Sequence, residues 1–154
     1  MPQWLEWNAL MCITHVSSWI LVRVFYVTTL KDQAVKYAQR FIRRGKEAWL
    51  NIYELDEDFM SSSFIISEFE KYDANWLDFV VACRKGIVIG NYDIVKGGIA
   101  NDKVFRTVDL FFSGDITKEE ALRRLLFELP NDQLCIRSQE ILDNYLTFKD
   151  SIRL

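Results

Sequence analysis

Hydrophobic and polar positions along the chain predict short strands mixed with helices. The clearest boundary lies within residues 25–44. Phe25 to Thr29 are all β-branched or aromatic, which predicts a strand. We expect Thr29 to cap the helix that follows and Gly45 to end it. The apolar face of this helix is predicted to carry Ala34, Tyr37, Ala38 and Phe41.

Further strands and helices follow in an irregular order. Strands are predicted over residues 48–55, 63–69, 92–95 and 133–137, and helices over 74–85, 101–113, 117–126 and 138–148. Asp73 is an expected N-cap, and Thr117 with Glu120 has the spacing of a capping box. Because βαβ units are too few for a doubly wound sheet, the pattern predicts an α+β domain.

Composition narrows the classes of protein that fit. A chain of 154 residues suits one domain, and its net charge of −3 offers no overall field for nucleic acid or anionic membrane. The single histidine excludes mechanisms that need two. Three isolated cysteines, without a CxxC pair, argue against a zinc ribbon or a disulfide framework and favour the cytoplasm.

Residues 1–24 have an unusual composition, rich in tryptophan and with Glu6 and Arg23 as their only charges. They have neither the basic start nor the cleavage motif of a signal peptide. The run from Ala9 to Val22 is too short and too polar to span a bilayer, so no membrane association is expected.

Residue types alone indicate little chemistry. His15 has serine neighbours, but no GxSxG motif accompanies it. The acidic residues 56–58 lack EF-hand spacing, and the glycines lack the spacing of a phosphate-binding loop. Gln133, flanked by Asn131 and Asp132, could hydrogen-bond a ribose hydroxyl. Periodicity and spacing therefore indicate a domain class without an activity.

Several segments between Phe25 and about Lys149 carry a resemblance to a known family. They are FYVTTLKDQAVKYAQRF, IYELDED, WLDFVVACR, YDIVKGGIANDKVFRTVDLFF, TKEEALRRLLFE and NDQLCIRSQEIL. Together they resemble the bacterial domain-of-unknown-function family 3990, most specifically in the YDIVKGGIAND block. That family in turn resembles the ADP-ribosyltransferases, which split NAD and transfer ADP-ribose.

The resemblance implies a split antiparallel sheet with surrounding helices, and a set of site residues. Tyr26 would lie beside the nicotinamide of NAD, and Tyr37, eleven residues later, would stack on it. Thr28 would line the pocket. Gln133 would take the place of a glutamate that contacts the ribose. Because an amide carries no charge, it would stabilise an oxocarbenium-like centre less well, which favours single transfer or NAD hydrolysis.

Two motifs of that superfamily are missing. No YHGS occurs, and Leu21 to Val24 stand where FGKG is expected. The codons possible for Trp19 to Val24 allow a neighbouring reading frame to spell DFGKG directly before Phe25. We therefore expect residues 1–24 to be an out-of-frame segment with an altered first strand, and 25–154 to be a single domain. Impaired or absent activity, marginal stability and self-association follow.

Two function classes stay open. The first is an NAD-using enzyme without a metal that modifies a protein or nucleic-acid acceptor, and an aromatic cleft over Tyr26 and Tyr37 would favour it. The second is a non-enzymatic protein-interaction domain, and a flat exposed patch of aromatic residues would favour that. The patch would consist of Trp49, Trp76 and Phe79. An unrelated α+β fold, with the aromatics in its core, is a third alternative.

Overall fold

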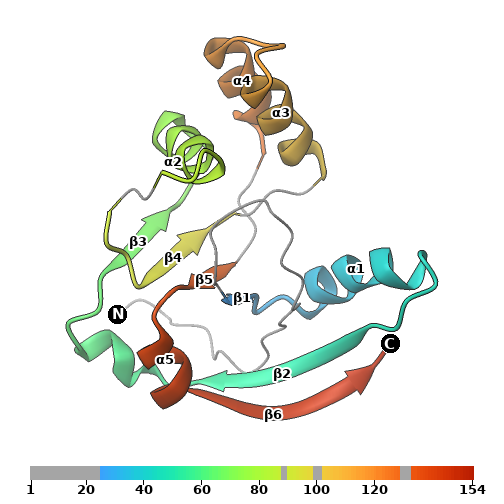
Figure 1. The fold of residues 1–154 in the computed structure, drawn as a ribbon, viewed down its shortest axis with the longest axis vertical. Coiled ribbons are helices and arrows are strands. Elements are labelled where there is room, and N and C mark those ends of the chain that lie inside the picture. Colours follow the sequence, from blue (N-terminus) through green and yellow to red (C-terminus); the bar gives the residue numbers. More distant parts are fainter. Residues whose placement is uncertain (1–24, 88–89, 99–101, 129–132) are drawn as a thin grey trace.

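The computed structural model describes residues 25–87, 90–98, 102–128 and 133–154 (Figure 1). Within these ranges the chain forms two separate sheets with helices around them, which confirms the predicted α+β class. His15 and the predicted out-of-frame segment lie outside the described residues.

The larger sheet has four strands. Their order is β1 (Phe25–Val27), β5 (Leu134–Ile136), β4 (Ile94–Gly97) and β3 (Ile66–Phe69). β5 is antiparallel to both of its neighbours, whereas β3 and β4 are parallel. A helix connects β3 to β4, and such a crossover is what parallel neighbours require. The larger sheet is therefore mixed, because one of its three strand pairs is parallel where the resemblance implied a split antiparallel sheet.

The smaller sheet pairs β2 (Trp49–Leu55) with β6 (Leu146–Arg153) in an antiparallel ribbon. β6 corrects the prediction of one helix over residues 138–148, because the observed helix α5 (Gln139–Asn144) ends before it. In the ribbon Phe148 lies opposite Tyr53, with the two ring centroids 5.5 Å apart. This pairing with a distant strand overrides the local helical pattern.

The remaining helices lie close to their predicted positions. They are α1 (Lys31–Ile42), α2 (Ala74–Arg84), α3 (Asp102–Phe112) and α4 (Lys118–Leu125). The short 3-10 helix η1 (Glu57–Ser61) was not predicted. Two predicted caps are confirmed: the Asp73 carboxylate accepts from the Trp76 N–H, and the Thr117 hydroxyl from the Glu120 N–H. The predicted cap of α1 is wrong, because Leu30 occupies the N-cap position without a side-chain hydrogen bond.

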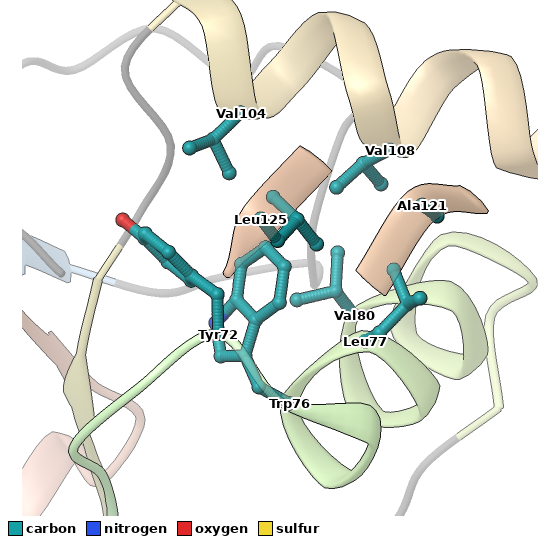
Figure 2. Close-up of a cluster of buried hydrophobic side chains, with 8 residues drawn as sticks. All are labelled: Tyr72, Trp76, Leu77, Val80, Val104, Val108, Ala121 and Leu125. Atoms are coloured by element: carbon teal, nitrogen blue, oxygen red, sulfur yellow. The ribbon is translucent and has the colours of Figure 1, made fainter. Parts of the chain in front are cut away.

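The four-stranded sheet separates two hydrophobic cores. Alternate residues of its strands, including Val27, Ile94 and Ile136, pack on one side against Leu55, Phe59 and Ile141. The second core lies among α2, α3 and α4, as Figure 2 shows. Its members are Tyr72, Trp76, Leu77, Val80, Val104, Val108, Ala121 and Leu125.

A third, smaller hydrophobic cluster packs α1 against β2. Ala34 and Ala38 of α1 pack with Ala48 and Leu50, so α1 lies along the β2–β6 ribbon, away from α3 and α4 (Figure 1). None of the described helices combines the length and the apolar character that crossing a bilayer needs.

Candidate functional site

One face of the four-stranded sheet brings two of the predicted site residues together. Tyr26 of β1 and Val95 of β4 both lie directly opposite Cys135 of β5. Gln133 lies two residues before Cys135, and Gly97 two residues after Val95. Because side chains two residues apart in a strand share a face, these five positions line the same side of the sheet.

A cavity of about 40 Å3 lies on this face, between the sheet and helices α2 and α3. A volume of roughly 10–15 Å3 holds one water molecule, so the cavity admits a small group and not a whole dinucleotide. Its walls are mainly aromatic and aliphatic. The lining residues are Tyr26, Phe69, Trp76, Phe79, Val80, Arg84, Val95, Gly97, Gly98, Phe105, Val108, Gln133 and Cys135.

The Tyr26 hydroxyl is hydrogen-bonded to the Cys135 thiol inside the fold. Burial raises the pKa of Tyr26 well above its usual value, and the neighbouring Cys135 adds to this effect. Burial also raises the pKa of Cys135 to about 12, although the hydrogen bond from Tyr26 opposes the shift. Both groups therefore stay protonated at neutral pH, so neither acts there as an anionic nucleophile or base.

Gln133 is held in place by its backbone. The Gly97 N–H donates to the Gln133 carbonyl at 3.0 Å. The carbonyl of Gly98, which follows Gly97 in the chain, accepts from the Trp76 indole N–H at 3.1 Å. A Cβ atom on Gly98 would lie only 2.3 Å from the Tyr72 hydroxyl oxygen. The end of β4 is thus fixed between β5 and α2, and this fixes one rim of the cavity.

Arg84 is the charged member of the lining, and the sequence reasoning missed it. Its Nη1 donates to an Asp109 carboxylate oxygen at 2.6 Å, which links α2 to α3. Its side chain is only 5% exposed, whereas that of Asp109 is 47% exposed. The sequence did contain a signal for it: Arg84 lies four residues after Val80 and eight after Trp76, which puts all three on one side of α2.

Two other predicted site residues lie outside the cavity lining. Tyr37 is 36% exposed on α1, because the face of α1 that packs on β2 carries small alanines. Its ring contacts Phe41, and the Arg40 guanidinium carbon lies 5.2 Å from its centroid. It adds a small rise to the pKa of Tyr26. Thr28 is buried, and its hydroxyl accepts from the Leu30 N–H at 3.1 Å, so it shapes the turn into α1.

The exposed aromatic patch proposed for a protein partner does not form. Trp76 is buried in the core among α2, α3 and α4, and Phe79 is only partly exposed there. Trp49 is exposed, but it belongs to the other sheet. Over the part of the chain that the structure describes, no cluster of three or more His, Cys, Asp or Glu could hold a metal ion.

Comparison with known proteins identifies a family but no characterised relative. The model of the family described as "Protein of unknown function (DUF3990)" matches residues 22–148. No curated protein matches the chain, and no solved structure does. Since the match covers most of the 154 residues, the chain belongs to the DUF3990 family.

Proposed function

We propose that the cavity binds the nicotinamide end of NAD, as part of a site of the ADP-ribosyltransferase type. The observation that carries this proposal is that Tyr26 of β1 and Gln133, the residue just before β5, line the same cavity although they are far apart in the sequence. Predominantly aromatic and aliphatic walls are typical of a small-molecule site.

Each residue would have a distinct part in binding. The Tyr26 ring supplies a flat apolar wall for the nicotinamide, since its hydroxyl is already bonded to Cys135. The Gln133 side-chain amide hydrogen-bonds a hydroxyl of the adjoining ribose. Only this end of NAD enters the cavity, and the rest of the dinucleotide lies outside it.

The expected reaction is slow cleavage of the bond between nicotinamide and ribose. Positive charge develops on the ribose in the transition state, and a neutral amide stabilises it less than a carboxylate does. Single transfer of ADP-ribose to an acceptor, or hydrolysis of NAD, is therefore favoured over chain growth. The aromatic patch that would have supported a non-enzymatic interaction domain does not form, and the cavity that supports the enzyme contains Tyr26 without Tyr37.

The test is nicotinamide release from NAD, measured by chromatography on two proteins. One is the present chain, and the other has residues 1–24 replaced by an in-frame strand carrying YHGS and DFGKG. We expect release from the repaired chain, little or none from the present one, and loss of activity in Gln133→Ala of the repaired chain. A repaired chain that folds but neither binds nor cleaves NAD would contradict the proposal.

A further inference from the structure

Helix α1 and the turn after it concentrate positive charge. Residues 31–46 hold six cations and one carboxylate, so they carry a net charge of +5 in a chain whose total is −3. The cations are Lys31, Lys36, Arg40, Arg43, Arg44 and Lys46, and the carboxylate is Asp32. Residues 1–24 have Glu6 and Arg23 as their only charges, so they leave this balance unchanged. The local field is therefore strongly positive although the chain as a whole is negative.

Most of these cations lack the ion pairs that cations elsewhere in the fold make. Outside this segment the cations in ion pairs are Arg84, Lys96, Lys103, Lys118, Arg123, Arg124, Lys149 and Arg153. Across the described ranges, no carboxylate forms an ion pair with Lys36, Arg43, Arg44 or Lys46. Like charges three and four residues apart destabilise a helix. The helix dipole favours cations only in the last turn, so it does not compensate for Lys36, one turn before Arg40.

The cations lie on the side of α1 that faces away from the rest of the fold. Ala34 and Ala38 are buried where α1 packs on β2. At 3.6 residues per turn, Lys36, Arg40 and Arg43 fall on the opposite side of the helix. Lys36 and Arg43 are exposed, and Arg43 keeps helical backbone angles at the C-cap, so it continues the row. The row covers seven residues and is thus about 10 Å long.

One aromatic side chain lies beside this row. Tyr37 is 36% exposed, and the Arg40 guanidinium carbon lies 5.2 Å from the centroid of its ring. Ile42 is also exposed, but it follows Ala38 by four residues and therefore lies on the side of the helix that packs. The outer face thus presents cations and one ring, without the apolar side chains that an interfacial helix inserts into a membrane.

We infer that this outer face of α1 binds single-stranded nucleic acid, with Lys36, Arg43 and Arg44 on the phosphates and the Tyr37 ring against a base. A nucleic-acid strand carries one phosphate about every 3.4 Å, so a row of this length meets several of them. An arginine can bind two phosphate oxygens at once. The aromatic ring beside the cations favours nucleic acid over an acidic peptide, because every base has a flat face on which the ring can stack. This inference goes beyond the proposed function and does not rest on it.

Two triple variants separate the charge of this face from the charge of the whole chain. Each replaces three cations by glutamine, so both change the net charge equally. They are Lys36→Gln/Arg43→Gln/Arg44→Gln on α1 and Lys118→Gln/Arg123→Gln/Arg124→Gln on α4, where all three cations are in ion pairs. Glutamine is a good helix former and exposed ion pairs contribute little to stability, so both variants should fold. Thermal unfolding followed by circular dichroism verifies this.

Binding is measured by fluorescence anisotropy of a labelled oligothymidine of about 12 nucleotides, on the full chain and over a series of salt concentrations. The α1 variant should weaken binding by roughly tenfold or more at low salt. It should also reduce the slope of log K against log salt by about 2, since each lost phosphate contact contributes about 0.7. The α4 variant should leave the slope unchanged. Tyr37→Ala should weaken binding about five- to a hundredfold, whereas Tyr37→Phe keeps the ring and should retain most of the affinity.

Four results would overturn the inference. The first is no binding of the oligonucleotide at low salt by the folded, unsubstituted chain. The second is an equal loss in the α1 and α4 variants, which would mean a response to net charge alone. The third is unchanged affinity in Tyr37→Ala. The fourth is displacement of the oligonucleotide by polyglutamate or by phosphatidylserine vesicles at equal charge concentration, which would assign the face to an acidic protein or to a membrane. Nicotinamide release from NAD is scored separately, so failure of either proposal leaves the other standing.

Discussion

Burial determines what chemistry the Tyr26–Cys135 pair can offer. A tyrosine and a cysteine could supply an acid or a nucleophile, but here burial holds both in the protonated form. What remains available to a ligand is the flat Tyr26 ring in the cavity wall. The proposed site therefore works by binding and orientation, without a protein nucleophile.

This pair predicts a loss of stability at high pH. The pKa of Cys135 is about 12 in the folded chain and starts from an ordinary value of 9.0. The stabilisation is fully present below pH 9 and is lost as the pH rises toward 12, with a slope of about 1.4 kcal/mol per pH unit. Tyr26 acts in the same direction at still higher pH. Urea unfolding at several pH values measures the slope.

The control for this prediction is Cys135→Ala, which removes the thiol and should reduce the slope between pH 9 and 10 to what buried Cys83, whose pKa burial also raises, contributes. A free energy of unfolding that stays constant in the unsubstituted chain over that range would contradict the burial of the thiol. Reaction with a thiol reagent at pH 8 gives an independent check, since buried Cys83 and Cys135 should react only after denaturation.

At the scale of single residues, the fold brings two of the predicted site residues to one cavity and leaves two outside it. Tyr26 and Gln133 came from motif resemblance, and the fold brings them to one cavity. Tyr37 and Thr28 came from the same resemblance, but the rotation of α1 leaves the first at the surface and uses the second in a turn. Arg84 was missed because a basic residue in the last turn of a helix usually faces solvent.

Among the elements, the junction between β4 and α2 is the tightest part of the site. Gly97 and Gly98 pass so close to Phe69 and Tyr72 that a Cβ atom on either glycine would meet a neighbour at 2.8 or 2.3 Å. The Trp76 indole N–H holds the same backbone segment by donating to the Gly98 carbonyl. The cavity rim therefore depends on an absence of side chains at these two positions.

Gly98→Ala should destabilise the fold by about 1–3 kcal/mol through overpacking against the Tyr72 ring, and it should disturb the cavity. Gly86→Ala is the matched control, because open space surrounds Gly86 and only its left-handed backbone conformation opposes a side chain, at a cost of about 1–2 kcal/mol. Thermal unfolding measures both, and binding of NAD separates them. Equal loss of NAD binding in the two variants would show that the junction does not shape the site.

Asp73 predicts a smaller effect that belongs to the helix start alone. Its carboxylate accepts from the Trp76 N–H at 3.0 Å, so Asp73→Ala should lower the free energy of unfolding by about 1 kcal/mol. Asp73→Asn keeps a capping oxygen and should restore most of the loss. Failure of asparagine to do so would indicate that the charge, and not the cap, stabilises α2.

The elements that local chemistry specifies were predictable from the sequence. Asp73 and Thr117 mark helix starts through a hydrogen bond that their own side chains supply, and both were identified. β6 was not, because Leu146 and Phe148 acquire their strand conformation from partners on β2, far away in the chain. The parallel pairing of β3 and β4 also depends on distant contacts, because the crossover through α2 must pack on the sheet for the two strands to meet.

For the whole molecule, the four-stranded sheet couples the two main cores. Ile136 lies fully buried on one side of it, while Cys135, the preceding residue, faces the cavity on the other. Damage to either core should therefore destabilise the same cooperative unit. Self-association through an open sheet edge stays a prediction, with β1 as one outer strand among those that the structure describes.

Leu77→Ala and Ile141→Ala test this coupling, since each removes a completely buried side chain from a different core. Each should lower the free energy of unfolding by about 2–5 kcal/mol and shift one common transition. Urea unfolding followed by circular dichroism and by tryptophan fluorescence should give coincident curves in both variants. Separate midpoints for the two probes would mean that the cores unfold independently.

The central claim is that Tyr26 and Gln133 form one ligand site, and a double-mutant cycle on NAD binding tests it most directly. Calorimetry would compare the repaired chain with Tyr26→Ala, Gln133→Ala and the double variant, with exposed Trp49→Ala as a control. One shared site predicts that the single substitutions weaken binding, that their effects are not additive, and that the control leaves Kd unchanged. Unchanged affinity in both single variants, with the fold intact, would contradict the claim.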